Sequence, residues 1–443
     1  MKLQLSIFLV PCSILFLCCC SVSHKISKEA NSILLKDTAI RQGHIGISIY
    51  EPATGKYWYN YNADKYFIPA SNTKLFTLYA GMKYLGDSLP GMKIMEYENN
   101  ICLLPTADPT LLHPDFKKQP VFDFLSNSKK SLWAVRGNFR AKAYGSGWAW
   151  DDYNDSYMNE RSALPVFGNL IVFSGTRNNI SYFPKGITSP LDMIVTGSTD
   201  GSISYINKVD RDVYRNNFVI HIYGTEKKNI LVPFITSADL SFKLLSDTLH
   251  KNILSPGAAP PLNMDMPKTY LIHSQPSDSL FKPMMHNSDN FFAEQTLLMA
   301  SNERLGYMSD TDMIDTLLKN DLKDIPQKPK WVDGSGLSRY NLFTPASFIY
   351  ILEKLKTEFG LERLKTILPT GGEGSLKNYF KKDISNIFAK TGTLSNNCTL
   401  SGYLVTGKGK LLIFSILVNN YQTSATPVRM AMEHFLQEIR KKY

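Results

Sequence analysis

The predicted secondary structure changes character twice along the chain, and this change limits the fold more than any other feature. Both ends predict regular strands and amphipathic helices. The middle, from about residue 90 to residue 267, predicts short β-like runs interrupted by Asn, Asp, Gly and Pro, with few long helical periods. Within it, the Pro-rich stretch 256–267 is typical of a linker. The economical architecture is a mixed α/β domain that is split in the sequence, with a β-rich inserted region.

We therefore assign residues 24–88 and 268–443 to one domain and residues 89–267 to the inserted region. A chain of 443 residues has room for two or three such units. The elements predicted for the split domain are strands at 45–50, 56–61, 387–393, 400–405 and 411–419, a helix that begins near Ser71 and ends at Gly86, and a terminal helix from Pro427.

The first twenty residues predict an export signal. Lys2 supplies a positive charge, and an uncharged, mainly apolar run follows to Cys20. Cys18, Cys19 and Cys20 end this run, as in a bacterial lipoprotein signal, in which a cysteine at the cleavage site becomes lipidated. Ordinary cleavage after Ser23 is the alternative, and a retained membrane helix fits less well because Pro11 interrupts the run. We expect an exported, periplasmic or cell-envelope protein, with a lipid anchor as one outcome of processing.

Composition argues against several other classes of protein. The net charge of +10 would suit a nucleic-acid partner, but no basic run exceeds three residues and no nucleic-acid motif is present. Attraction to anionic envelope surfaces is the simpler explanation. Behind the signal, Cys102 and Cys398 stand far apart, and no C-x-x-C or Cys/His cluster predicts a metal. We expect no nucleic acid, no metal and no cofactor.

The first candidate motif is Ser71-Asn72-Thr73-Lys74. At the start of a helix, positions i and i+3 share a face, so the Lys74 amine can reach the Ser71 hydroxyl. Serine needs an adjacent base to act as a nucleophile, and lysine can serve if desolvation and a second cation lower its pKa. About two S-x-x-K matches are expected by chance in a chain this long. One is Ser126 to Lys129, which predicts a solvated turn, whereas Ser71 begins an apolar helix whose N-terminus favours negative charge.

The second motif is Ser288-Asp289-Asn290, which precedes an apolar helical segment. Ser288 can relay a proton to a leaving amine, and Asn290 can hold a substrate amide. The alternative is a helix cap, which these residue types favour. The same S-x-N pattern recurs at 395–397, where we expect a hairpin turn.

The third motif, Lys390-Thr391-Gly392-Thr393, is the most specific, with a chance expectation of about one in ten per chain. It ends a β-like run, and Gly392 would let a ligand backbone approach closely. The strand edge could pair with a substrate backbone. Lys390 would meet a terminal carboxylate and supply the cation that lowers the pKa of Lys74. The alternative is a surface strand that ends in a turn.

Together, S-x-x-K, S-D-N and K-T-G are the motifs of β-lactamases and penicillin-binding proteins. With a long insertion between the first two motifs, nearly the whole mature chain resembles the D-alanyl-D-alanine carboxypeptidase/endopeptidases, the class C low-molecular-mass penicillin-binding proteins. Four further segments resemble the family pattern: 147–152, 333–339, 372–376 and 400–403.

The resemblance implies a β-lactamase/transpeptidase-like fold and cleavage of D-alanyl bonds in peptidoglycan peptides, with β-lactam antibiotics as covalent inhibitors. It implies that Lys74 takes the Ser71 proton, that the backbone N–H groups of Ser71 and Thr393 form the oxyanion hole, and that Ser288 protonates the departing amine. It also places Asp152 opposite the free amine of a diamino acid in the substrate, although the neighbouring Asp151 competes for this role.

Two other functions remain open at this point. A β-lactamase or esterase of the same fold is disfavoured by the long insertion and by the segment 333–339. A non-catalytic protein that binds wall peptides is disfavoured because such a protein has no need of a lysine base such as Lys74.

Overall fold

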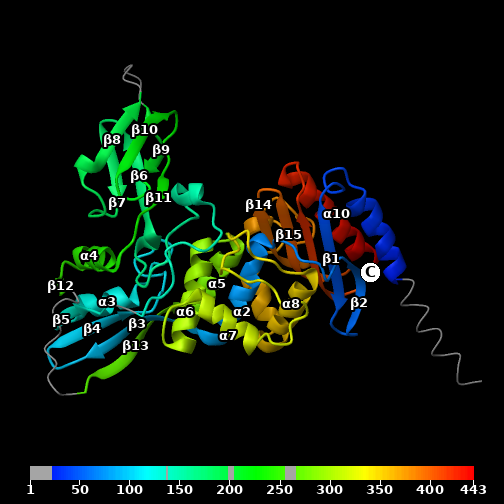
Figure 1. The fold of residues 1–443 in the computed structure, drawn as a ribbon, viewed down its shortest axis with the longest axis horizontal. Coiled ribbons are helices and arrows are strands. Elements are labelled where there is room, and N and C mark those ends of the chain that lie inside the picture. Colours follow the sequence, from blue (N-terminus) through cyan, green and yellow to red (C-terminus); the bar gives the residue numbers. More distant parts are fainter. Residues whose placement is uncertain (1–21, 136–137, 198–203, 255–265) are drawn as a thin grey trace, which may run out of the picture.

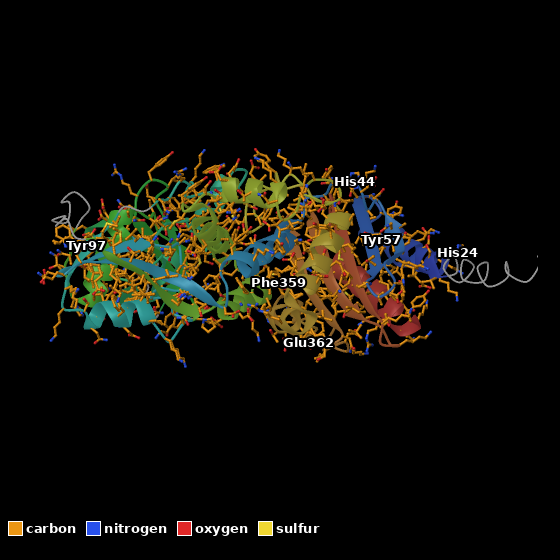
Figure 2. All side chains as sticks on the ribbon, turned by 90° about the horizontal axis from the view of Figure 1, so that it is seen from below. His24, His44, Tyr57, Tyr97, Phe359 and Glu362 are labelled. Atoms are coloured by element: carbon orange, nitrogen blue, oxygen red, sulfur yellow. The ribbon has the colours of Figure 1, made fainter. Side chains whose placement is uncertain are left out.

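The computed structural model describes residues 22–135, 138–197, 204–254 and 266–443. The molecule is elongated, with the inserted region at one end, a five-stranded sheet at the other and a layer of helices between them (Figure 1). Figure 2 shows the same arrangement from below, with Tyr97 of the insertion and His24 at opposite ends. The predicted signal, 1–20, and most of the predicted linker, 256–267, lie outside the described residues.

The five-stranded sheet joins the two ends of the chain. Its strand order is β14-β15-β16-β1-β2, and all of its pairs are antiparallel. The strands are β14 (Ile387–Leu394), β15 (Asn397–Val405), β16 (Leu411–Asn419), β1 (His44–Glu51) and β2 (Lys56–Tyr61). The central contact is between β1 and β16, where Ser48 lies opposite Ser415. The predicted mixed α/β fold, built from both ends of the chain, is confirmed.

Helices cover both faces of this sheet, which explains why its central strands are apolar on both sides. Along β16, alternate residues from Leu412 to Val418 pack with α10 (Ala425–Lys442) and the π-helical turn η1 (Asn31–Leu35). Ile413 and Leu417 face the opposite core with α8 (Pro345–Phe359). The terminal helix starts two residues before the predicted Pro427, behind Ser424.

The first motif, Ser71 to Lys74, begins the central helix. The 3-10 turn η2 (Ala70–Thr73) leads into α2 (Lys74–Tyr84), and the four residues that predicted this helix, Leu75, Leu78, Met82 and Leu85, are all buried. Around α2 pack α8 and the other helices of this layer, α5 (Ser277–His286), α6 (Asn290–Leu305), α7 (Asp310–Lys319) and α9 (Leu361–Ile367). Because α2 is surrounded, it has no polar face.

The inserted region contains two sheets around a shared core. The sheet nearer the helices has the order β12 (Ile253–Leu254), β5 (Ser131–Ala134), β4 (Asn100–Pro105), β3 (Ser88–Glu96), β13 (Lys268–Pro276). The outer sheet has the order β11 (Ile230–Pro233), β6 (Leu170–Thr176), β9 (Tyr205–Arg211), β10 (Phe218–Gly224), β8 (Met193–Gly197), with β7 (Asn179–Phe183) on β6. Two helices, α3 (Pro120–Asn127) and α4 (Ala238–Leu249), join them, together with short 3-10 turns at η3 (Trp150–Asn154), η4 (Phe167–Asn169) and η5 (Pro190–Asp192).

Three local expectations can be compared directly with these elements. The S-x-N match at 395–397 is a hairpin turn between β14 and β15, as predicted, with Asn396 at φ 67°. The S-x-x-K match at Ser126 is not a simple turn, because Ser126 and Asn127 form the last residues of α3. The strand β13 pairs with β3 along its length. By this pairing we propose that the insertion extends to Pro276, beyond the boundary expected at 267.

Candidate active site

The Lys74 ammonium nitrogen is the centre of the site. It lies 2.9 Å from Ser71 Oγ, one turn earlier in the chain, and 2.6 Å from Asn290 Oδ1 at the start of α6. Its third hydrogen bond is donated to the backbone carbonyl of Ser335, at 2.7 Å. The structure thus brings together predicted residues from the first and second motifs, and adds Ser335 from the segment 333–339.

Burial governs the acidity of Lys74. Its side chain is fully buried, and this desolvation lowers its pKa to about 8, against the opposing charges of Asp289, Asp333 and Glu294. We expected desolvation and a second cation, Lys390, to lower this pKa. Burial is the cause that acts at Lys74, whereas the repulsion between the two amines lowers the pKa of Lys390.

Lys390 donates to Ser288 Oγ at 2.9 Å and to the carbonyl of Thr391 at 2.8 Å. Burial, followed by the charges of Lys74 and Arg429, holds the pKa of Lys390 well below its ordinary value. Ser288 has φ 60°, in the left-handed region that side chains other than glycine seldom adopt. This conformation aims its hydroxyl at Lys390, so the third motif and the second meet through a direct contact.

The second motif is both a helix cap and part of the site. Asp289 is the N-cap of α6 and accepts a hydrogen bond from the Phe292 amide at 2.8 Å. Asn290 next to it turns its oxygen to Lys74 and its Nδ2 group to the Tyr157 carbonyl, 3.2 Å away in the insertion. Asp289 therefore caps the helix, whereas Asn290 contacts Lys74, and its predicted contact with a substrate amide stays a prediction.

Gly392 permits a close approach within the chain itself. A Cβ at this position would lie 2.3 Å from Thr399 Oγ1, 2.7 Å from the Pro69 carbonyl and 3.0 Å from the Ser71 amide nitrogen. The turn that carries Ser71 is thus pressed against β14, and Ala70 before it has φ 48°. We expected Gly392 to make room for a ligand backbone. The space it leaves is occupied by Thr399 and by the turn that carries Ser71.

The segment 333–339 packs against the turn that carries Ser71. Asp333 is fully buried and accepts hydrogen bonds from the amides of Gly336 and Ser338 at 2.9 and 2.6 Å. Gly336 has φ 85°, and a Cβ there would lie 1.9 Å from the Ala70 carbonyl. This tight loop holds the Ser335 carbonyl against Lys74.

The segment 400–403 has a comparable structural role. Ser401 accepts a hydrogen bond from the buried Asn72 side chain at 2.7 Å and itself donates to Ser415 at 2.8 Å. The turn of Ser71 is in this way tied to the middle of the sheet.

Asp152 lies on the insertion side of the site, in η3. Burial and the carboxylates of Asp155 and Asp152 raise the pKa of the Tyr157 hydroxyl. The Tyr157 carbonyl accepts a hydrogen bond from Asn290, so Tyr157 connects Asp152 and Asp155 to the site. Asp152 is half-buried, whereas Asp151 is exposed.

Arg429 is a residue of the site that sequence analysis missed. It extends from α10, and its Nη2 group donates to Thr393 Oγ1, the last residue of the third motif. Nothing in the pattern of the terminal helix distinguishes it from a solvated arginine. Among the residues that the structure describes, no group of three or more His, Cys, Asp or Glu side chains could hold a metal ion.

The sequence and the fold of this chain are similar to those of known proteins. The model of the D-Ala-D-Ala carboxypeptidase 3 (S13) family matches residues 27–439. The D-alanyl-D-alanine carboxypeptidase DacB of Haemophilus influenzae is 23% identical over 411 residues, which cover 82% of this chain and 83% of that protein. The D-alanyl-D-alanine carboxypeptidase of an Actinomadura species is 25% identical over 451 residues, covering 90% of this chain and 82% of that protein.

A solved structure has the same fold. The crystal structure of penicillin binding protein 4 from Haemophilus influenzae superposes with a TM-score of 0.70 at 19% identity, covering 94% of this chain and 99% of that one. A second structure of that protein, complexed with a β-lactam, gives a TM-score of 0.67. The family model spans nearly all of the sequence, and this chain therefore belongs to the D-Ala-D-Ala carboxypeptidase 3 (S13) family.

Proposed function

We propose that the chain is a serine DD-carboxypeptidase, a DD-endopeptidase or both, acting on peptidoglycan stem peptides through an acyl-enzyme on Ser71. The observation that carries this proposal is the 2.9 Å contact between Ser71 Oγ and the buried amine of Lys74. With a pKa of about 8, an appreciable fraction of that amine is the free base near neutral pH. Membership of the family supports the same class of reaction.

The surroundings of Lys74 orient its lone pair. Asn290 Oδ1 and the Ser335 carbonyl can only accept hydrogen bonds, so each takes one N–H of the amine. When Lys74 loses a proton, its two remaining N–H groups stay on these acceptors. The lone pair is then directed at Ser71, where it can remove the hydroxyl proton as the oxygen attacks the carbonyl of the penultimate D-alanine.

The remaining steps use the other two motifs. The amides of Ser71 and Thr393 receive the oxyanion, and loss of one such donor in a comparable site costs about 3–4 kcal/mol. Ser288 gives its hydroxyl proton to the departing amine as the peptide bond breaks and takes a proton from Lys390, with which it is in contact. Water then hydrolyses the ester and releases the shortened peptide: Lys74 returns its proton to Ser71 Oγ, and the proton lost by the water restores Lys390. Penicillin acylates the same hydroxyl, and the resulting acyl group is hydrolysed slowly.

Thr391, Gly392 and Thr393 form the edge that receives the substrate backbone, and a terminal carboxylate lies beside them. Lys390 was predicted to meet this carboxylate, but its pKa is held low in the free site. Arg429, which remains charged at any accessible pH, already contacts Thr393. We assign the permanent positive charge for carboxylate binding to Arg429, with Lys390 gaining a proton when the anion binds.

Asp152 is proposed to bind, through its carboxylate, the side-chain ammonium of a diamino acid in the stem peptide. Its position near Tyr157, whose carbonyl holds Asn290, supports this role. The chain is also proposed to be exported and held in the periplasm or cell envelope, with a lipid on Cys18, Cys19 or Cys20 as the candidate anchor. Labelling of cells with a radioactive fatty acid, with and without these cysteines, tests the anchor.

The central experiment is covalent labelling with a fluorescent penicillin, followed by mass mapping of the labelled peptide. The label should be on Ser71; a label elsewhere, or none, would refute the proposal. Digestion of purified muropeptides then separates trimming of terminal D-alanine from cleavage of cross-links. A protein that rapidly destroys penicillin and leaves muropeptides intact would instead be a β-lactamase of this fold.

A further inference from the structure

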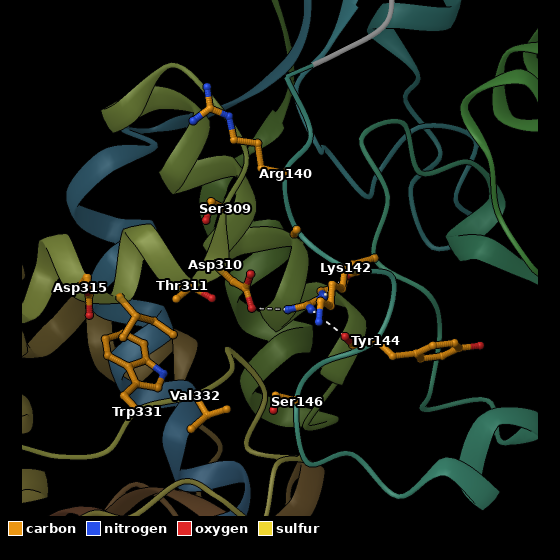
Figure 3. A pocket seen from close by; sticks show the side chains of 13 residues that line it. Arg140, Lys142, Tyr144, Ser146, Ser309, Asp310, Thr311, Asp315, Trp331 and Val332 are labelled. Atoms are coloured by element: carbon orange, nitrogen blue, oxygen red, sulfur yellow. Dashed lines mark hydrogen bonds and ion pairs between the residues drawn. The ribbon is translucent and has the colours of Figure 1, made fainter.

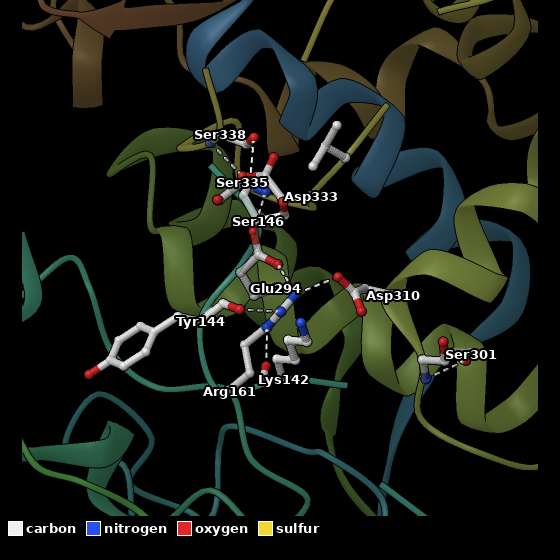
Figure 4. A network of polar contacts seen from close by, with 12 residues as sticks. Lys142, Tyr144, Ser146, Arg161, Glu294, Ser301, Asp310, Asp333, Ser335 and Ser338 are labelled. Carbon is white, nitrogen blue, oxygen red and sulfur yellow. Dashed lines mark hydrogen bonds and ion pairs between the residues drawn. The ribbon is translucent and has the colours of Figure 1, made fainter. Parts of the chain in front are cut away.

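A buried ionic cluster joins the insertion to the helices behind Lys74 (Figure 4). Arg161, in the insertion, places Nη1 2.6 Å from Asp310 Oδ2 at the start of α7 and 3.3 Å from Glu294 Oε2 in α6. The Arg161 side chain is 2% exposed. Its other nitrogens donate to the carbonyls of Lys142 and Tyr144 at 2.9 and 3.1 Å, so the guanidinium is held from several sides.

The second oxygen of Glu294 leads from this cluster to the site. Glu294 Oε1 accepts the amide of Ser335 at 2.7 Å, and the carbonyl of Ser335 accepts from Lys74 at 2.7 Å. Glu294 follows Asn290 by four residues on α6, so both side chains lie on one face of the helix. One reaches Lys74 directly, and the other reaches it through Ser335.

A carboxylate in this environment needs a counter-ion. Burial and the nearby Asp333 raise the pKa of Glu294 to about 7, whereas Arg161 acts in the opposite direction. The charged groups around Glu294 are Arg161 from the insertion, Asp310 from α7, Asp333 from the supporting loop and Lys74 from α2. Without the guanidinium, the three buried acids Glu294, Asp310 and Asp333 would lie close together with no cation beside them except the base itself.

We propose that Arg161 is a positioning residue for the general base: it holds Glu294, which through the Ser335 peptide orients the Lys74 amine toward Ser71. The inference rests on the proposed function, since it takes Lys74 as the base. It gives the insertion a part in the rate of acylation as well as in substrate choice.

The outer side of this cluster opens into a pocket, which makes the proposal testable by chemical rescue (Figure 3). The pocket has a volume of about 390 Å³ and is lined by Arg161, Asp310, Lys142 and Trp331, among others. When Arg161 is shortened to alanine, a small guanidinium ion can enter from this side and occupy the place of the lost group between Glu294 and Asp310.

The experiment measures the rate constant of acylation by fluorescent penicillin. Arg161→Ala should lower it by about tenfold to a hundredfold, the range expected when a reacting group is displaced by about 1 Å. Methylguanidinium should restore much of this loss, and Arg161→Lys should retain more activity than Arg161→Ala. The matched control is Arg363→Ala, which removes an arginine from a bidentate ion pair with Asp278 between α9 and α5. It should show no loss of rate and no response to methylguanidinium.

If Arg161→Ala fails to fold, Glu294→Gln tests the same contact. The glutamine keeps an oxygen that accepts a hydrogen bond from the Ser335 amide, but it carries no negative charge. Because the anionic Glu294 raises the pKa of Lys74, this variant should move the acid limb of the pH–rate profile to lower pH by about half a unit or more. An unmoved limb, or Arg161→Ala labelled as fast as wild type, overturns the inference. Wild-type protein that fails to label on Ser71 overturns the proposed function instead.

Discussion

The rate of acylation should follow the ionisation of Lys74. The lowering of its pKa from 10.5 to about 8 corresponds to about 3 kcal/mol of preference for the neutral amine in the folded protein. Only the neutral form can accept the Ser71 proton, so activity is lost as pH falls through the pKa. Relative to the plateau at high pH, the rate should be about one half at pH 8, about a tenth at pH 7 and about a hundredth at pH 6.

This profile is measured as the second-order rate constant for labelling by fluorescent penicillin between pH 6 and pH 9.5. Circular dichroism at each pH verifies that the protein stays folded, so that a loss of labelling reports chemistry. A midpoint near 10.5 would mean that burial does not shift the pKa of Lys74. A flat profile, or one that falls as pH rises, would refute the assignment of neutral Lys74 as the base.

Three substitutions test the other assignments. Lys74→Ala should slow acylation by about 10²- to 10⁴-fold, the usual contribution of a general base, and Lys129→Ala should leave it unchanged; equal effects would mean that the nucleophile is misassigned. Asp152→Asn should reduce hydrolysis of diaminopimelate-type peptides more than that of simple D-alanyl peptides, unlike Asp151→Asn, and parallel losses on both substrates would remove its role. Arg429→Leu should raise KM by about 30-fold for peptides with a free terminal carboxylate and far less for the same peptides as amides, and equal effects on both would contradict carboxylate binding.

The parts of the fold that were predicted from sequence are those in which local pattern and burial agree. The strand predicted at 387–393 is observed as Ile387–Leu394, and that predicted at 411–419 has the same bounds in the structure. β16 is the central strand of the sheet and is covered by helices, so its side chains are apolar on both faces. β14 is an edge strand, but all of its residues except the last two are buried, and it too stands out from the loops around it.

The end that we propose for the insertion, at Pro276, has no signal in the local sequence. β13 pairs with β3, which lies far away in sequence and contributes no local signal to residues 268–276. The helical content of the inserted region was also underestimated. Helix α4 has twelve residues and begins after the N-cap Ser237, but the β-like segments around it obscured this signal.

Of the two causes predicted for the low pKa of Lys74, desolvation is the one that acts, and the sequence carries a signal for it. From Lys74 to Met82 the helix carries no other charged side chain, and a helix that is apolar on all sides is a buried one. Glu294 had a signal too, since it shares a helix face with Asn290. Arg161 and Arg429 had none, because a buried arginine in a loop, or a half-buried one at a helix start, has the same local sequence as a solvated one.

The proposed role of Lys74 as a base sets two requirements that conflict. The amine must be buried to be neutral near neutral pH. A buried amine without hydrogen-bond acceptors, however, lowers the stability of the folded protein and is free to turn away from the serine. Uncharged acceptors satisfy both requirements, because Asn290 Oδ1 and the Ser335 carbonyl hold the amine without stabilising its proton as a carboxylate would. These acceptors must converge from directions that no single segment can supply. A domain assembled from both ends of the chain, with the insertion bracing the loop of Ser335 through Glu294, supplies them.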